Sequence, residues 1–142
     1  VVGTGLMEDE LKAMVREMGA EEYVEFTGWI DDDARDRLLS GAKAFIFPAP
    51  DEDFGIVVVE AMAAGVPVIT FDSCGPGEIV LDGKTGKLVK EFSQDALDEA
   101  VTNFDQQKYS VEDCRARARE FSKEIFIEKV VETVENSVWS EK

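Results

Sequence analysis

The feature that most constrains this chain is an alternation of short apolar stretches with segments of helical character. Apolar stretches of four to six residues lie at 24–27, 44–47 and 66–71, and helical spacing or helix-capping residues occur between them. This alternation is typical of parallel βαβ units, in which helices cover both faces of the sheet. We therefore predict an α/β fold, an α/β/α sandwich of three layers with a mainly parallel sheet. A length of 142 residues favours a single domain, 1–142.

The expected elements follow from periodicity and from start and stop signals. We expect strands at 1–2, 24–27, 44–47, 66–71 and 87–89, and helices at 7–18, 31–39, 55–64, 93–104, 110–121 and 123–139, with one helical turn at 78–81. Four apolar residues of the last helix, Phe126, Val130, Val131 and Val134, share one side. Residues 73–78 are expected to form a loop because they are rich in turn residues.

The segment 56–59 is β-branched, so a strand competes with a helix there. A helix is favoured because residues 60–64 are strong helix formers, Gly65 stands at the position of a C-cap and Pro67 follows. A strand at 56–59 would also leave no room for a crossover before the next strand at 66–71.

The net charge of −16 argues against binding to nucleic acid or to an anionic membrane, since both need a positive field. Without histidine, the chain contains no His-based nucleophile pair, proton shuttle or His metal site. Cys74 and Cys114 lack metal-ligand spacing and, with no signal-peptide pattern, indicate reduced thiols in the cytoplasm. We predict no metal and no nucleic-acid partner.

Ligands of parallel sheets bind at the carboxyl ends of the strands. Four loops that leave those ends are rich in glycine, proline or acid: 3–5, 28–30, 48–55 and 72–78. In the third loop, Gly55 begins the predicted helix. The first N–H groups of a helix have no partner within it and form an anion site, which Gly55, Ile56 and Val57 would supply here. The alternative is that Gly55 only starts a helix.

Two glutamates flank this helix start. Glu60, in the helix, has two acceptor oxygens that suit a vicinal diol such as ribose, and it interrupts an apolar run expected to face the sheet. Glu52, before the helix, could accept sugar hydroxyls or stabilise positive charge at an anomeric carbon. Asp51 and Asp53 are alternates to Glu52, and a solvated acidic loop is the competing interpretation of all three.

Other residues carry weaker signals. Trp29 follows an expected strand and either stacks on a base or packs internally. Gly3-Thr4-Gly5 lacks the third glycine of a dinucleotide fingerprint. The turn 75–78 offers a second close backbone approach or is a plain turn.

The segments Glu52-Asp53-Phe54-Gly55 and 60–68 together resemble the E-x7-E region of GT4-type retaining glycosyltransferases, whose GT-B architecture has two Rossmann-like domains. Similar segments at 2–5, 24–28, 44–48 and 83–86 extend the resemblance over most of the chain. It implies a Rossmann-like fold and most of a C-terminal donor-binding domain. The acceptor domain and the first βα unit would be absent, because 1–5 resembles the end of a strand without its start.

The resemblance also implies roles for individual residues. Glu52 would contact the transferred sugar as the catalytic glutamate, and Glu60 would hold the ribose. The expected donor-binding residues are Phe54, Gly55, Ile56, Val57, Trp29, Ile30, Gly3 and Gly5, with Trp29 and Ile30 near the base. The reaction would transfer a hexose from a UDP- or GDP-linked donor, by our expectation of the GDP-mannose type, with retention and without a metal or other cofactor.

The implied acceptor is a glycan or lipid held by the absent N-terminal domain, in a protein that is cytoplasmic or peripheral at the cytoplasmic membrane face. The resemblance is incomplete in two places. The basic pair that neutralises the diphosphate would precede Val1, and Gly75 and Glu78 match the loop 73–78 of the family only loosely. A sugar-nucleotide epimerase, whose histidine has no counterpart here, and a non-catalytic nucleotide-binding module are the alternatives. The fragment alone is expected to be inactive.

Overall fold

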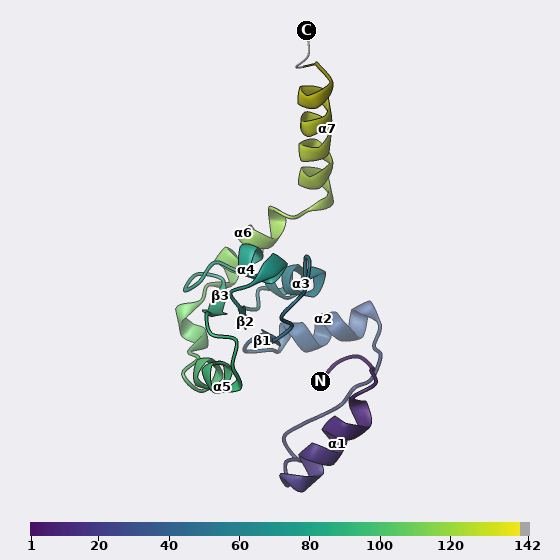
Figure 1. The fold of residues 1–142 in the computed structure, drawn as a ribbon, viewed down its shortest axis with the longest axis vertical. Coiled ribbons are helices and arrows are strands. Elements are labelled where there is room, and N and C mark those ends of the chain that lie inside the picture. Colours follow the sequence, from purple (N-terminus) through teal and green to yellow (C-terminus); the bar gives the residue numbers. More distant parts are fainter. Residues whose placement is uncertain (140–142) are drawn as a thin grey trace. The chain divides into compact units, whose positions relative to one another are not determined.

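The computed structural model describes residues 1–139 of the chain, with side chains through residue 136. The described chain forms two compact units, one of residues 1–38 and one that begins at Leu39. Figure 1 labels their helices and strands.

The first unit contains helix α1, Glu8–Glu17, and most of α2, Asp32–Ser40. Acidic residues occupy the first turn of α1, where they complement the helix dipole. Asp31 begins α2 because its Oδ1 accepts the Ala34 N–H at 2.8 Å. Both predicted helices are therefore confirmed.

The strands predicted at 1–2 and 24–27 are wrong. Only isolated bridges join Val2 and Gly3 to Gly28. The Gly3 N–H donates to the Gly28 carbonyl at 2.8 Å, and the Thr27 N–H donates to the Val1 carbonyl at 3.0 Å. These isolated bridges and single hydrogen bonds do not form a continuous ladder.

The second unit is built on a parallel sheet of three strands, β1 (Phe45–Phe47), β2 (Val68–Phe71) and β3 (Gly86–Val89), in the order β1-β2-β3. Phe45 pairs with Val68, and Val68 pairs with Gly86. The strands predicted at 44–47, 66–71 and 87–89 are confirmed with small shifts of their ends. The connections run through α3 (Ile56–Ala64) and α4 (Cys74–Ile79).

Helices cover both faces of this sheet. One buried cluster joins the sheet to α3, α4 and α6 (Val111–Arg119), and its members are Leu39, Val58, Ala61, Met62, Val66, Val68, Ile79, Val80, Leu88, Cys114 and Ala118. The other cluster joins it to α5 (Gln94–Thr102) through Ile69, Phe71, Val89, Ala96, Leu97, Ala100 and Phe104. In Figure 1, α5 lies across the sheet from α3. The predicted α/β/α layering is confirmed.

The helix at 56–64 is confirmed against the competing strand, with Gly65 as its C-cap. The predicted caps are confirmed too: Ser93 Oγ accepts the Ala96 N–H, and Ser110 Oγ accepts the Asp113 N–H, each at 3.2 Å. A short 3-10 helix, Gln106–Lys108, lies between α5 and α6.

The loop predicted at 73–78 and the turn predicted at 78–81 are wrong, because α4 begins at Cys74 and ends at Ile79. The glycines and Pro76 suggest a loop, but Pro76 lies in the first turn, where its missing N–H breaks no helical hydrogen bond. Val80 then returns to extended backbone.

The last helix, α7, spans Lys123–Trp139 as predicted. The four apolar side chains predicted to share its face, Phe126, Val130, Val131 and Val134, are each at least 44% exposed. Across residues 1–139, no helix has both the length and the apolar character needed to cross a membrane.

Because the thiol of Cys114 is buried, we expect the folded chain to lose stability at alkaline pH. Burial first, and the Asp113 carboxylate second, raise its pKa to about 11 from an ordinary 9.0. The folded chain keeps this proton after the unfolded chain has lost it, so the free energy of unfolding falls as pH rises from 9 to 11. A difference of two pKa units between the folded and unfolded chains lowers the free energy of unfolding by about 2–3 kcal/mol over this pH range.

Thermal melts of the wild type, Cys114→Ala and Cys74→Ala between pH 8 and pH 11 check this prediction. Cys114→Ala should flatten the pH dependence of the melting temperature, and Cys74→Ala, which removes an exposed thiol, should not. Parallel pH profiles for all three proteins would contradict it.

Candidate functional site

The start of α3 has the geometry that the sequence predicts for an anion site. Gly55 is the N-cap residue, with φ +81°, and its carbonyl accepts the Val58 N–H at 2.9 Å. That left-handed conformation favours glycine and turns the chain from the loop into the helix. The N–H groups of Ile56 and Val57 follow in the first turn, where the helix offers them no acceptor.

The Glu52 carboxylate lies directly at this helix start. Its Oε1 accepts the Gly55 N–H at 3.0 Å and the Phe54 N–H at 3.3 Å. A carboxylate thus already occupies one of the N–H groups predicted to receive a phosphate. A bound phosphate would compete with Glu52 for the Gly55 N–H.

Glu60 lies on a different face of α3 from the one expected. The helix buries Val58, Ala61 and Met62 against the core, whereas Glu60 follows Ile56 by four residues and shares its face. Ile56 is 64% exposed, and Glu60 is half-buried. The expectation that Glu60 faces the sheet is therefore wrong, because the register of the buried residues turns it outward.

The N-terminal end of α4 supports the Glu52 loop from behind. The Gly75 N–H donates to the Glu52 carbonyl at 3.1 Å, and Ser73 Oγ donates to the Pro50 carbonyl at 3.2 Å. A Cβ at position 75 would lie 2.4 Å from the Asp53 carbonyl oxygen. The close approach predicted at this glycine is thus made to the loop that carries Glu52.

A cavity of about 290 Å³ adjoins this loop. Phe54 lines it, and its ring meets the Phe121 ring edge-on at a centroid distance of 6.0 Å. The other lining residues are Asp53, Gly75, Glu78, Ile79, Arg117, Glu120, Phe121 and Lys129. Neither Arg117 nor Phe121 is predicted as a site residue from the sequence, because their spacing on α6 and just after it indicates only a helix.

Comparison with known proteins assigns the family. Residues 1–121 match the model of the family described as Glycosyl transferases group 1. The chain belongs to this family. The predicted GT4-type resemblance is confirmed.

Two curated relatives illustrate the similarity. The chain is 40% identical over 99 residues to an alpha-1,3/1,6-mannosyltransferase, ALG2, of Dictyostelium discoideum, covering 63% of this chain and 24% of the relative. It is 37% identical over 108 residues to a GDP-mannose-dependent alpha-(1-6)-phosphatidylinositol monomannoside mannosyltransferase of Mycolicibacterium smegmatis, covering 71% and 28%. The chain thus spans only about a quarter of the length of each.

Solved structures show the same architecture. Sucrose-phosphate synthase from Thermosynechococcus elongatus matches 97% of this chain with a TM-score of 0.79 and 25% identity, over 36% of its own length. Anabaena Alr3699/HepE in complex with UDP and glucose matches 95% of the chain with a TM-score of 0.74 and 26% identity, over 39% of its length.

In this group 1 glycosyltransferase chain, four predicted site residues belong to the first unit. Gly3 and Gly5 line a cavity of about 250 Å³ together with Glu8, Leu11 and Phe26, among others. Trp29 is 79% exposed, and Ile30 is half-buried. Internal packing of Trp29, one of the two interpretations left open, does not occur within the first unit.

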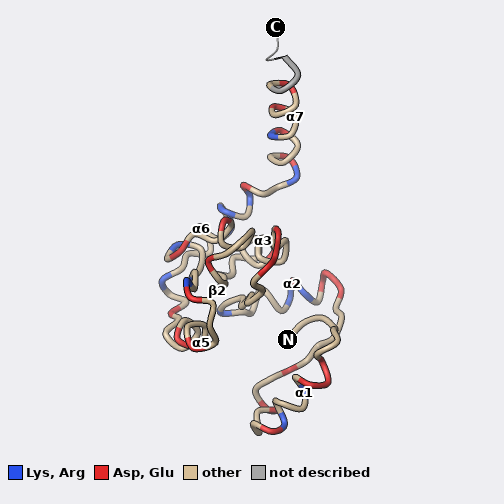
Figure 2. The backbone as a smooth tube through the Cα atoms, in the orientation of Figure 1, with Lys and Arg blue, Asp and Glu red and all other residues tan. Residues whose placement is uncertain are grey.

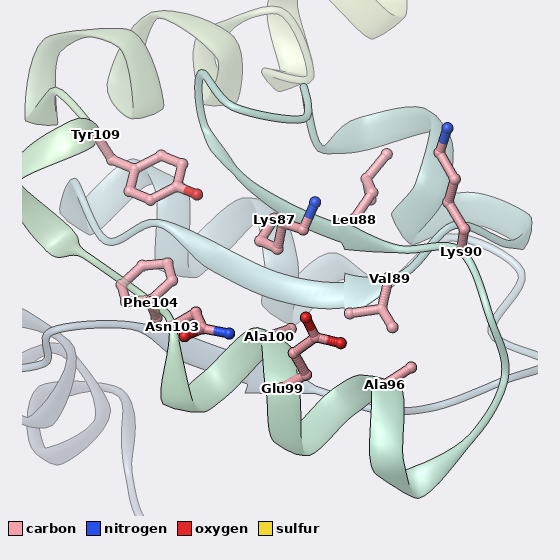
Figure 3. A pocket seen from close by; sticks show the side chains of 10 residues that line it. All are labelled: Lys87, Leu88, Val89, Lys90, Ala96, Glu99, Ala100, Asn103, Phe104 and Tyr109. Carbon is pink, nitrogen blue, oxygen red and sulfur yellow. The ribbon is translucent and has the colours of Figure 1, made fainter.

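Another cavity, of about 350 Å³, lies between β3 and α5, on the sheet face opposite α3 (Figure 3). The rings of Phe104 and Tyr109 stack there at 5.0 Å. Burial, then Asp82 and Asp105, raise the pKa of Tyr109, and Asp82 also lies 3.6 Å from Lys87. None of its lining residues is predicted as a site residue from the sequence, and none belongs to the start of α3 or is Glu52.

Within the described residues, no three Cys, Asp or Glu side chains are grouped as a metal site. Acidic residues are prominent on the loop that leads into α3 (Figure 2). The predicted site residues of the second unit therefore lie on the acidic loop before α3 and on α3 itself.

Proposed function

We propose that this chain is the donor-binding part of a longer retaining glycosyltransferase. The enzyme would transfer a hexose from a nucleotide diphosphate sugar to an acceptor hydroxyl. The observation that carries the proposal is the Glu52 carboxylate, which accepts the N–H groups of Phe54 and Gly55 directly before α3, with the half-buried Glu60 further along that helix. Both units would belong to one donor-binding domain, and a second domain would hold a glycan or lipid acceptor.

In this proposal the diphosphate binds at the start of α3 and takes the N–H groups of Ile56 and Val57, and that of Gly55 after Glu52 swings away. Released from Gly55, the Glu52 carboxylate is close enough to the phosphate-linked sugar to accept its hydroxyls. Glu60 holds the ribose hydroxyls. Roles for Trp29, Ile30, Gly3 and Gly5 in holding the nucleotide remain predictions from the family resemblance.

The proposed chemistry breaks the bond between the anomeric carbon and the diphosphate oxygen. The acceptor oxygen forms its bond to the same face of that carbon, and the nucleoside diphosphate leaves with the electron pair and takes up the proton that the acceptor hydroxyl gives up. Positive charge develops at the anomeric carbon, where the Glu52 carboxylate stabilises it. The developing negative charge on the diphosphate is stabilised by the N-terminus of α3.

The net charge of −16 opposes binding of a diphosphate. A helix N-terminus stabilises an exposed anion by only about 0.3–1 kcal/mol. We infer that basic residues outside this chain complete the diphosphate site and that the chain alone is inactive. The protein would work in the cytoplasm or peripherally at the cytoplasmic face of a membrane.

A thermal-shift panel on the full-length protein tests the function. GDP-mannose, UDP-glucose, GDP and UDP are compared, followed by a transfer assay with the donor that raises the melting temperature. The GDP-mannose-dependent mannosyltransferase of Mycolicibacterium smegmatis makes GDP-mannose the first donor to test. Stabilisation by one nucleotide diphosphate sugar is expected, and no stabilisation by any nucleotide would contradict the proposal.

Glu60→Ala in the full-length protein should weaken nucleotide binding. Loss of two hydrogen bonds from a carboxylate to the ribose, each worth about 1.5–3 kcal/mol, predicts an affinity at least about 100-fold lower by calorimetry. Glu128→Ala, an exposed glutamate of α7, is the matched control and should bind normally. Unchanged affinity in Glu60→Ala would remove Glu60 from the ribose site.

A further inference from the structure

Arg117 of α6 ties two parts of the second unit together. Its Nε donates to the Ile79 carbonyl at 2.8 Å, and its Nη2 donates to the Glu78 carbonyl at 2.7 Å. The side chain is only 18% exposed. These carbonyls lie at the C-terminal end of α4, which leaves its last acceptors without partners inside the helix. The planar guanidinium thus caps α4 with two fixed donors.

The other end of α4 holds the Glu52 loop. The Gly75 N–H donates to the Glu52 carbonyl, and a Cβ at position 75 would clash with the backbone of Asp53 and Phe54. A displacement of the capped end of this short helix would therefore also displace the Glu52 backbone.

A second route joins Arg117 to the same loop through aromatic rings. The guanidinium lies 4.7 Å from the centroid of the Phe121 ring. Phe121 in turn meets the edge of Phe54. Arg117 therefore supports the segment 52–54 from two directions, through α4 and through Phe121.

The start of α3 is supported differently. Val58, Ala61 and Met62 are fully buried in the core, whereas the Arg117 guanidinium donates to Glu78, Ile79 and Glu120. The Ile56 and Val57 N–H groups proposed for the diphosphate belong to α3, whereas Glu52 belongs to the loop that Arg117 supports. A change at Arg117 should therefore move Glu52 more than the first N–H groups of α3.

We propose that Arg117 is a positioning residue that sets the placement of Glu52 against the transferred sugar. This inference rests on the proposed function, because it assigns Glu52 to the sugar. Removal of Arg117 lowers turnover while nucleotide affinity is preserved. At temperatures well below the melting point, a general loss of stability alone would not lower turnover while leaving nucleotide affinity unchanged.

The test compares Arg117→Met, Arg117→Lys and a control, Arg115→Met, in the full-length protein. Arg115 lies on the same helix and is at most weakly bonded, with Nη2 3.4 Å from the Ala64 carbonyl. Misplacement of a catalytic group by about 1 Å can cost about 100-fold, so we expect kcat to fall about 10- to 100-fold in Arg117→Met. The dissociation constant of the nucleotide should change less than about twofold, which corresponds to about 0.4 kcal/mol of binding free energy.

Arg117→Lys keeps the charge but not the two-pronged donor geometry, so its kcat should fall nearly as far. It also serves as the second variant if Arg117→Met does not fold. Arg115→Met should resemble the wild type. Amide hydrogen exchange, measured without donor, should speed up at residues 52–55 in both Arg117 variants and stay unchanged at 58–62.

Wild-type kcat in a folded Arg117 variant, or equal losses of kcat and nucleotide affinity, would overturn the inference. Unchanged exchange at residues 52–55 would also overturn it. If the wild-type protein itself transferred sugar from no donor, the proposed function would fail. The exchange measurement would then show separately whether Arg117 supports the loop.

Discussion

Glu52→Ala is expected to reduce sugar transfer by about 100- to 1,000-fold, the range seen when one group that stabilises transition-state charge is removed. Nucleotide binding should not weaken. The Glu52 carboxylate accepts the Gly55 N–H, so its removal frees that donor for phosphate and removes a negative charge beside it. We therefore expect the nucleoside diphosphate to bind as tightly as in the wild type, or more tightly.

Steady-state kinetics and calorimetry on the full-length protein measure both effects. Asp51→Ala is the matched control, because it removes an acid of the same loop whose side chain is exposed. Wild-type turnover in Glu52→Ala would end the proposed role of Glu52. Loss of turnover in Asp51→Ala instead would transfer that role to the neighbouring acid.

Gly75→Ala is expected to displace the Glu52 loop and to abolish most activity. The added Cβ would lie 2.4 Å from the Asp53 carbonyl oxygen and 2.5 Å from the Phe54 Cα, and backbone atoms cannot rotate away as a side chain can. Overpacking of this kind costs about 1–3 kcal/mol. The melting temperature should fall, and turnover should fall beyond what that loss of stability explains.

Gly77→Ala is the control for this substitution, because it lies on the same helix and its added Cβ would meet the Asp72 backbone at a less severe 3.2 Å. Turnover of both variants is measured well below their melting temperatures. Equal, near-wild-type turnover would show that the contact between α4 and the loop does not set the position of Glu52.

The sequence predicted the parts of the fold that local signals determine. The β-branched segment at 56–59 forms a helix because strong helix formers follow it and Gly65 ends it. Local signals likewise predict the apolar strands at 44–47 and 66–71 and the helix caps at Ser93 and Ser110. The helix start before Ile56 and the place of Glu52 beside it follow from the same signals.

Other features depend on contacts between distant residues. The helix 74–79 contains two glycines and a proline, and its last carbonyls are capped by Arg117, 38 residues or more away in the sequence. The outward face of Glu60 depends on which residues of α3 the core buries, which periodicity alone leaves open in a helix that is apolar on nearly every side. Phe121 becomes relevant only because Phe54 packs against it.

Amide hydrogen exchange of the full-length protein, with and without the nucleotide that stabilises it, tests the central claim most directly. The proposed donor site predicts slower exchange at residues 52–60, centred on Gly55, Ile56 and Val57. It predicts little change at the cavity between β3 and α5, whose lining spans residues 87–109. Protection of residues 87–109 with none at 52–60 would contradict the assignment of the donor to the start of α3.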